Sequence, residues 1–124
     1  MSVAYQAARA AQVARHIAAL STEAKNEILR KIARRLETNA AKILKANVKD
    51  MNEGRAKGLP TGLLDRLLLN KERLKNIIAE VRNVAGLKDY VGEVLESREL
   101  PNGLLLHRIR VPIGVIGMIY EARP

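Results

Sequence analysis

The spacing of the apolar residues changes near residue 90, and this change limits what the chain can fold into. Before it, apolar residues recur every three or four positions, as in Ile28, Ile32 and Leu36, which is the period of an amphipathic helix. After it, apolar residues alternate or run together, as they do in strands. With 124 residues the chain is long enough for one domain at most. The sequence therefore predicts helices over 1–90, followed by β-structure.

The first part is expected to hold five helices, the first running from Val3 to Leu20. Side chains that accept hydrogen bonds from free backbone N–H groups favour helix starts, and glycine favours helix ends. The residues placed to cap or end the helices are Ser21, Thr38 or Asn39, Gly54, Gly58, Thr61, Asn70 and Gly86. The Leu and Ile stripes between them are interpreted as core.

Two runs with strand character follow, 92–99 and 104–111, separated by Leu100-Pro101-Asn102-Gly103. Proline suits the second position of a β-turn, and Asn-Gly favours the positive φ that closes a hairpin. Neither face of the second run is purely polar. The sequence therefore predicts a β-hairpin that lies against another surface rather than one that stands in water.

Pro112 ends the hairpin, and the run 113–119 after it is continuous, apolar and rich in β-branched residues. Such a run predicts a core strand buried on both faces, of the kind found inside a parallel sheet. A parallel strand needs neighbours reached through crossovers, and no later strand–helix unit is present in the sequence to supply them. Gly114 and Gly117 are too sparse for a dinucleotide-binding fingerprint.

No catalytic residue and no metal site are predicted from the residues alone. Cysteine is absent, which excludes a disulfide, a thiolate metal site and a cysteine nucleophile within these 124 residues. The two histidines, His16 and His107, have no partner at metal-ligand or triad spacing. No secretory signal is visible, and no apolar run reaches the roughly 20 residues that a membrane span needs.

The net charge of +9 leaves alternatives open. One is a non-enzymatic basic helical module that binds nucleic acid. Another is solvated helix faces, which the even spread of the basic residues and the lack of interleaved aromatic residues favour. A third is an acidic remainder of a longer chain that balances the charge. A separate hypothesis, based on the hairpin, is an interaction segment whose exposed edge pairs with another chain.

The stretch from Arg110 to Pro124, ending in Tyr-Glu-Ala-Arg-Pro, closely resembles a signature of the gamma-glutamyl phosphate reductase (glutamate-5-semialdehyde dehydrogenase) family, within the aldehyde dehydrogenase superfamily. The ending is highly specific, whereas Pro-x-Gly-Val-x-Gly is shared with many aldehyde dehydrogenases. The resemblance extends in order over nearly the whole chain. The other matching residues are Ala46-Asn47, Asp50, Gly58-Leu59, Leu63 to Leu67, Arg73-Leu74, Val91 to Val94 and Asn102 to Leu104.

The resemblance implies an α/β parent fold with a Rossmann-like cofactor domain, a catalytic domain and an oligomerising β-ribbon. Residues 1–90 would then be the N-terminal helical part of the cofactor-binding domain. Residues 91–112 would be the ribbon, and 113–124 the first strand of the dinucleotide-binding sheet. Homo-oligomer contacts are expected through residues 92–111. A cytoplasmic protein that meets neither membrane nor nucleic acid is expected.

The resemblance also implies a reaction, in which NADPH reduces L-glutamyl 5-phosphate to L-glutamate 5-semialdehyde in proline biosynthesis. A cysteine thiolate attacks the acyl phosphate, and the thioester then accepts hydride. In relatives that cysteine lies well downstream, so this chain is expected to be inactive alone. By position, Ile119, Tyr120 and Glu121 would lie near the cofactor, and Ala122 and Arg123 near the substrate.

Overall fold

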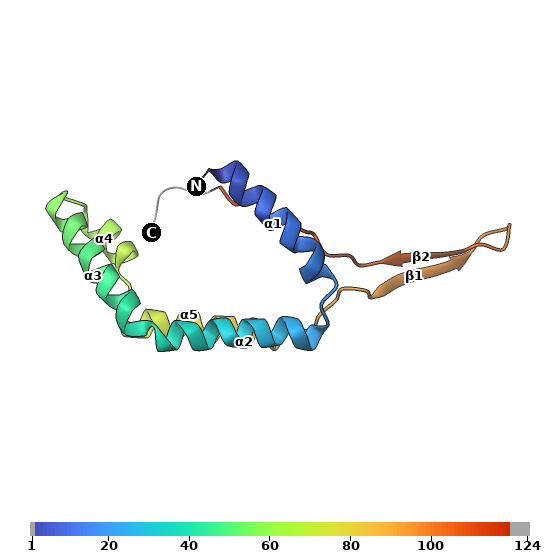
Figure 1. Ribbon diagram of the computed structural model, residues 1–124, viewed down its shortest axis with the longest axis horizontal. Coiled ribbons are helices and arrows are strands. Elements are labelled where there is room, and N and C mark those ends of the chain that lie inside the picture. Colours follow the sequence, from blue (N-terminus) through green and yellow to red (C-terminus); the bar gives the residue numbers. More distant parts are fainter. Residues whose placement is uncertain (1, 120–124) are drawn as a thin grey trace. The chain divides into compact units, whose positions relative to one another are not determined.

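The structure is a computed structural model that describes residues 2–119. Its elements are α1 (Val3–Ala18), α2 (Thr22–Thr38), α3 (Ala40–Ala56), α4 (Thr61–Leu67), α5 (Lys71–Val84), β1 (Val94–Glu99) and β2 (Leu105–Ile109) (Figure 1). These described residues form two compact units. One holds residues 2–22 and 88–117, with α1 and the strands, and the other holds residues 23–87 and 118–119. The prediction of a mostly helical segment with a β-hairpin is confirmed.

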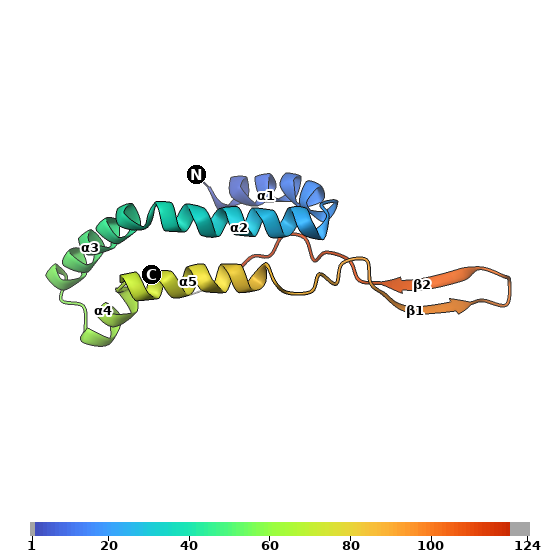
Figure 2. The ribbon, with the colours of Figure 1, turned by 90° about the horizontal axis from the view of Figure 1, so that it is seen from below.

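The helical unit has a small aliphatic core. α5 runs back along α2 (Figure 2), and Ala33, Leu74 and Ile78 are buried where these helices meet, Ala33 completely. Partly buried residues pack around this cluster: Leu36, Ala40, Ile43, Leu44, Leu69 and Val81. An ion pair between Arg82 of α5 and Glu37 of α2, at 2.6 Å, joins the same two helices at the surface. The predicted Ile and Leu stripes therefore do form the core of this unit.

Two predicted helix caps have different outcomes. The Asn70 side chain accepts a hydrogen bond from the Arg73 N–H at 2.8 Å, so the predicted cap of α5 is confirmed. Asn39 precedes α3 but makes no side-chain cap. Its Nδ2 instead donates to the Arg35 carbonyl oxygen at 2.8 Å, so the side chain satisfies the end of α2 rather than the start of α3. The two helices follow each other too closely for Asn39 to be free to cap the second.

The chain between α3 and α4 turns at Gly58, whose φ is 69°. This left-handed conformation suits glycine and ends α3 as predicted. The predicted cap at Thr61 is wrong by one residue, because Pro60 precedes α4 and Thr61 is its first residue. Gly54 and Gly58 bracket the end of α3 as predicted, and Gly54 lies buried in its last turn. A Cβ atom there would lie 3.1–3.2 Å from side-chain atoms of leucines 59, 64 and 67, so the glycine allows close packing.

The strands β1 and β2 form an antiparallel hairpin, called here the ribbon (residues 92–111). Gly103, with a φ of 82°, donates to the Leu100 carbonyl oxygen at 2.8 Å and closes the predicted turn. Val94 lies opposite Ile109, but Glu96 lies opposite Arg108, so the first strand carries an extra residue there. This β-bulge interrupts the ladder near the base of the ribbon.

The core strand predicted over 113–119 is not present. The described residues from Arg110 to Ile119 belong to no strand, and those from 113 to 119 are exposed. A strand that is buried on both faces requires hydrogen-bonded neighbours and covering helices. Among the described residues the only sheet is the two-stranded ribbon. Within residues 2–119 the apolar run therefore has no neighbouring strand with which to form hydrogen bonds.

Candidate functional site

Of the residues predicted to lie near the cofactor and the substrate, the structure describes Ile119. Ile119 is fully exposed, at 101% of its reference area. Tyr120, Glu121, Ala122 and Arg123 lie outside the described residues. Of the predicted site, the described residues therefore include only Ile119, and the assignment stays a prediction.

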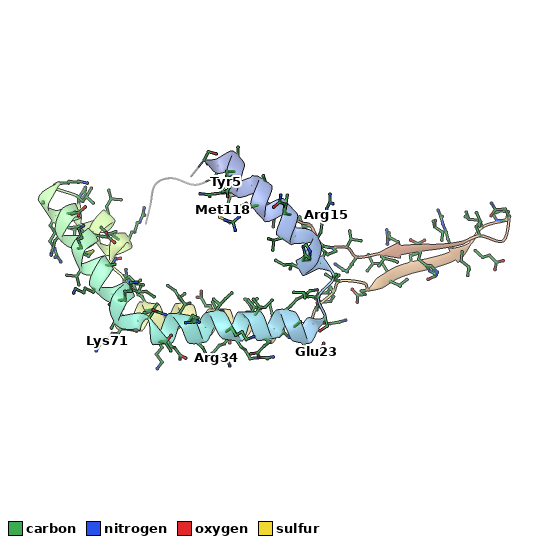
Figure 3. The ribbon with its side chains drawn as sticks, in the orientation of Figure 1. Tyr5, Arg15, Glu23, Arg34, Lys71 and Met118 are labelled. Carbon is green, nitrogen blue, oxygen red and sulfur yellow. The ribbon has the colours of Figure 1, made fainter. Side chains whose placement is uncertain are left out.

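The ribbon exposes apolar side chains on both of its faces (Figure 3). Alternate residues of β2 share a face. Leu105 and Ile109, 68% and 47% exposed, lie on one face with His107, while Leu106 and Arg108 lie on the other. The exposed large apolar residues of the ribbon are Val94, Leu95, Leu104, Leu105, Leu106, Ile109 and Val111. Exposed contiguous apolar surface of this kind is typical of an interaction surface.

Cross-strand side-chain pairs differ between the two faces. On the Leu105 face, the Ser97 hydroxyl and His107 Nδ1 are hydrogen-bonded at 2.8 Å. On the opposite face, Arg108 Nε lies 3.7 Å from a Glu96 carboxylate oxygen. The first face is therefore the less charged of the two and the better suited to apolar contact.

The base of the ribbon holds a cluster of four side chains, called here the neck cluster: Lys88, Tyr90, Glu93 and Arg110. The Glu93 carboxylate accepts from Arg110 Nε at 2.8 Å and from Lys88 Nζ at 3.3 Å. The same two cations lie over the Tyr90 ring, Lys88 Nζ at 4.8 Å and the Arg110 guanidinium carbon at 5.3 Å from its centroid. Both distances lie within the range for cation–π attraction.

Backbone hydrogen bonds join the two sides of the neck. The Glu93 N–H donates to the Tyr90 carbonyl oxygen at 3.2 Å, across a turn in which Gly92 has a φ of 86°. Gly92 N–H donates to the Arg110 carbonyl oxygen at 2.9 Å, and Arg110 N–H donates to that of Glu93 at 3.0 Å. In the same unit, the Thr22 hydroxyl donates to an Asp89 carboxylate oxygen at 3.1 Å. Thr22 thus lies close to the neck within this unit.

Asn47 is a buried polar residue of α3 that fixes the segment between α4 and α5. Its Nδ2 donates to the Leu67 carbonyl oxygen and its Oδ1 accepts from the Leu69 N–H, both at 2.8 Å. Arg73 holds the same segment from the other side, through the Leu68 carbonyl oxygen at 2.9 Å and the Asp65 carboxylate at 2.7 Å. Since both the Nδ2 and the Oδ1 of Asn47 have hydrogen-bond partners, we interpret Asn47 as a structural residue that holds this segment against α3.

An apolar groove of about 440 Å³ runs along α2 and the start of α3. Its lining is Ile28, Lys31, Ile32, Arg35, Leu36, Asn39 and Ile43. The groove has no acidic residue and no convergent polar groups that would orient a small ligand. It has the character of a packing surface rather than of a substrate site.

Electrostatics single out one carboxylate, on the solvent side of α2. The hydrogen bond from Arg34 at 2.7 Å, followed by that from Arg30 at 3.2 Å, holds the pKa of Glu27 below its ordinary 4.5. An i,i+3 pair of this kind is a common device on helix surfaces. The shift therefore indicates a surface ion-pair network rather than a catalytic acid.

Within residues 2–119 no group of three or more His, Cys, Asp or Glu side chains is arranged to hold a metal ion. In the same part of the chain, no helix is long and apolar enough to cross a membrane.

Two of three comparisons with known proteins found matches, and these matches carry the same name. No protein-family model matches the sequence. Gamma-glutamyl phosphate reductases from Vibrio atlanticus and Moorella thermoacetica are 57% and 53% identical over 88% and 94% of this chain, which covers 26% and 28% of their lengths. The reductase of Photobacterium profundum is 49% identical over the entire chain, which covers 30% of that enzyme.

Two solved structures resemble this one. Gamma-glutamyl phosphate reductase of Thermotoga maritima matches 87% of the chain with a TM-score of 0.83 and 36% identity, and the chain covers 26% of it. The Saccharomyces cerevisiae enzyme matches 90% with a TM-score of 0.78 and 34% identity, and the chain covers 29% of it. Both support the predicted parent fold, that of the aldehyde dehydrogenase-like enzymes.

The helices and ribbon therefore form part of an aldehyde dehydrogenase-like oxidoreductase fold. The chain corresponds to an N-terminal segment of gamma-glutamyl phosphate reductases and spans between a quarter and a third of the length of these relatives. The predicted resemblance is confirmed. The names of the relatives give no support to the nucleic-acid alternative.

Proposed function

We propose that this chain is the helical and ribbon segment of an NADPH-dependent reductase that converts L-glutamyl 5-phosphate to L-glutamate 5-semialdehyde in proline biosynthesis. The observation that carries the proposal is the 49–57% identity to gamma-glutamyl phosphate reductases over 88–100% of the chain. The agreement of the fold with two solved enzymes of the same name supports it. The enzyme acts in the cytoplasm.

The reaction divides between this segment and the remainder of such an enzyme. The proposed chemistry needs a thiolate nucleophile, and the 124 residues contain no cysteine. These residues alone therefore do not turn over substrate. Ile119, Tyr120 and Glu121 pass beside the bound NADP, and Ala122 and Arg123 beside the substrate. A guanidinium at Arg123 suits a phosphate or carboxylate.

The ribbon is a contact between copies of the enzyme. Its less charged face, with Leu105 and Ile109 exposed, offers apolar surface that assembly would bury. Residues 1–90 of the chain then contribute helices to the cofactor-binding domain, and 113–124 contribute the first strand of its sheet. That strand forms when the remaining strands of the sheet are present to pair with it.

A chimera tests the proposed activity. In the Vibrio atlanticus enzyme, the 109 matched residues are replaced by those of this chain. We expect a soluble enzyme that catalyses phosphate-dependent reduction of NADP⁺ by glutamate 5-semialdehyde, the reverse of the proposed reaction, with NAD⁺ as the comparison cofactor. A folded chimera without activity would refute the proposed function. A preference for NAD⁺ would refute the choice of cofactor.

The same chimera tests the ribbon. We expect the double substitution Leu105→Ser and Ile109→Ser to lower the assembled mass measured by light scattering. Leu106→Ser, on the opposite face of β2, is the matched control and should leave the mass unchanged. If the double variant keeps the parent mass, the ribbon face is not the contact.

A further inference from the structure

The neck cluster joins the two sides of the ribbon at a point where the ladder itself is weak. The β-bulge between Val94 and Glu96 removes regular pairing just above the neck. Below it, the paired backbone bonds of Gly92, Glu93 and Arg110 stand apart from the rest of the ladder. The correct pairing at the neck therefore needs support from side chains.

We propose that Lys88, Tyr90, Glu93 and Arg110 form a salt-sensitive clasp that holds the base of the ribbon closed. Glu93 is the centre of the clasp, because its two carboxylate oxygens bind cations from both sides of the neck. Tyr90 completes it, because both cations also lie over its ring. Without the negative charge of Glu93, the positive charges of Lys88 and Arg110 would remain close together over the Tyr90 ring and would repel each other.

The clasp differs in kind from the other ion pair of the ribbon. The Glu93 side chain is 33% exposed, whereas Glu96 and Arg108 are more exposed and their atoms lie 3.7 Å apart. A single exposed pair contributes little, but several charges that share one centre can act together. Because the cluster still lies at the surface, added salt screens it, with a Debye length that falls from about 10 Å at 0.1 M to about 3 Å at 1 M.

The consequence is a conformational device: the neck opens at high salt while the tip of the ribbon stays closed. The tip is held by uncharged contacts, the Gly103 N–H to the Leu100 carbonyl oxygen and the Leu104 N–H to Asn102 Oδ1. Neck and tip of the same hairpin thus depend on different forces. This difference provides an internal control.

Amide hydrogen exchange measured by NMR on the 124-residue chain tests the clasp. As NaCl is raised from about 0.1 M to about 1 M, we expect protection of the Gly92 and Arg110 amides to fall by a factor of about 3 or more, and that of the Gly103 amide by less than about 2, following the screening lengths above. Equal responses at neck and tip would overturn the proposal. Because neck and tip belong to the same ribbon, a change in ribbon assembly would alter the protection of both, whereas opening of the clasp alters that of the neck alone.

Two matched variants identify the source of the effect. Glu93→Gln keeps the side-chain size and removes the charge, so the neck amides should be weakly protected at low salt. They should no longer lose protection as NaCl is raised, because salt then screens only the repulsion between Lys88 and Arg110. Glu96→Gln removes the other ribbon carboxylate and should leave the salt response of the neck intact. A neck that still loses protection at high salt in the first variant, or that no longer does so in the second, contradicts a clasp centred on Glu93.

Discussion

Replacement of Asn47 by alanine gives the sharpest test of how the helical unit is held together. The substitution removes a donor to the Leu67 carbonyl oxygen and an acceptor for the Leu69 N–H, both at 2.8 Å. A neutral hydrogen bond contributes about 1 kcal/mol net, and a buried group left without a partner costs about 1–3 kcal/mol. Leu67 and Leu69 are half-buried, so water relieves part of this cost. We expect the free energy of unfolding to fall by about 2 kcal/mol.

Urea denaturation followed by circular dichroism measures this loss. With a slope of about 1–2 kcal/mol per molar urea, the midpoint should fall by about 1 M or more. Asn52→Ala is the matched control, because Asn52 lies on the same helix but is exposed and accepts only a long hydrogen bond, at 3.4 Å, from Arg55. Equal, small effects of the two substitutions would refute the conclusion that Asn47 fastens the segment between α4 and α5.

Three further predictions concern the core, the surface charges and the ribbon. Leu74→Ala, at a side chain 4% exposed, should cost about 2–5 kcal/mol in the same urea assay, and Ile77→Ala on the half-exposed side less; equal costs would contradict the assigned core. Because the native pKa of Glu27 is lower than its unfolded value, the ion-pair network stabilises above pH 4.5 and is lost as the pH falls through the native pKa. In NMR titrations Arg34→Gln should raise that pKa towards 4.5, and an unchanged pKa would refute the assigned cause. Gly103→Ala, at a φ of 82°, should cost about 1 kcal/mol and speed amide exchange at the ribbon tip; unchanged exchange would show that the turn does not need glycine.

The helices were predictable because their signals are local. A side chain such as Asn70 caps a helix three residues away, and the core stripes repeat within one helix. Where two signals compete within a few residues, the local argument fails. Asn39 can serve the end of one helix or the start of the next, and the hydrogen bond to Arg35 decides between them. Gly54 lies near the end of α3 as predicted, but its close packing could not be predicted locally, because the leucines that it contacts follow the helix.

The neck cluster could not be predicted from the sequence, because its members come from two segments of the chain, one before β1 and one after β2. Lys88, Tyr90 and Glu93 lie before β1, and Arg110 follows β2. Only the register of the hairpin, with its bulge, sets which charge meets which. Asn47 is similar, since its partners lie twenty and more positions away.

The run 113–119 shows most clearly what a sequence pattern can and cannot establish. Its continuous β-branched residues describe an environment, a strand covered on both faces, and not a conformation that the run can hold by itself. A helix carries its hydrogen bonds within one segment, so the helices of this chain form without distant partners. A sheet strand carries them between segments, so its formation depends on which neighbours are present. This difference explains why local signals predicted α5 correctly, while 113–119 matches the family in sequence and yet remains exposed in this chain.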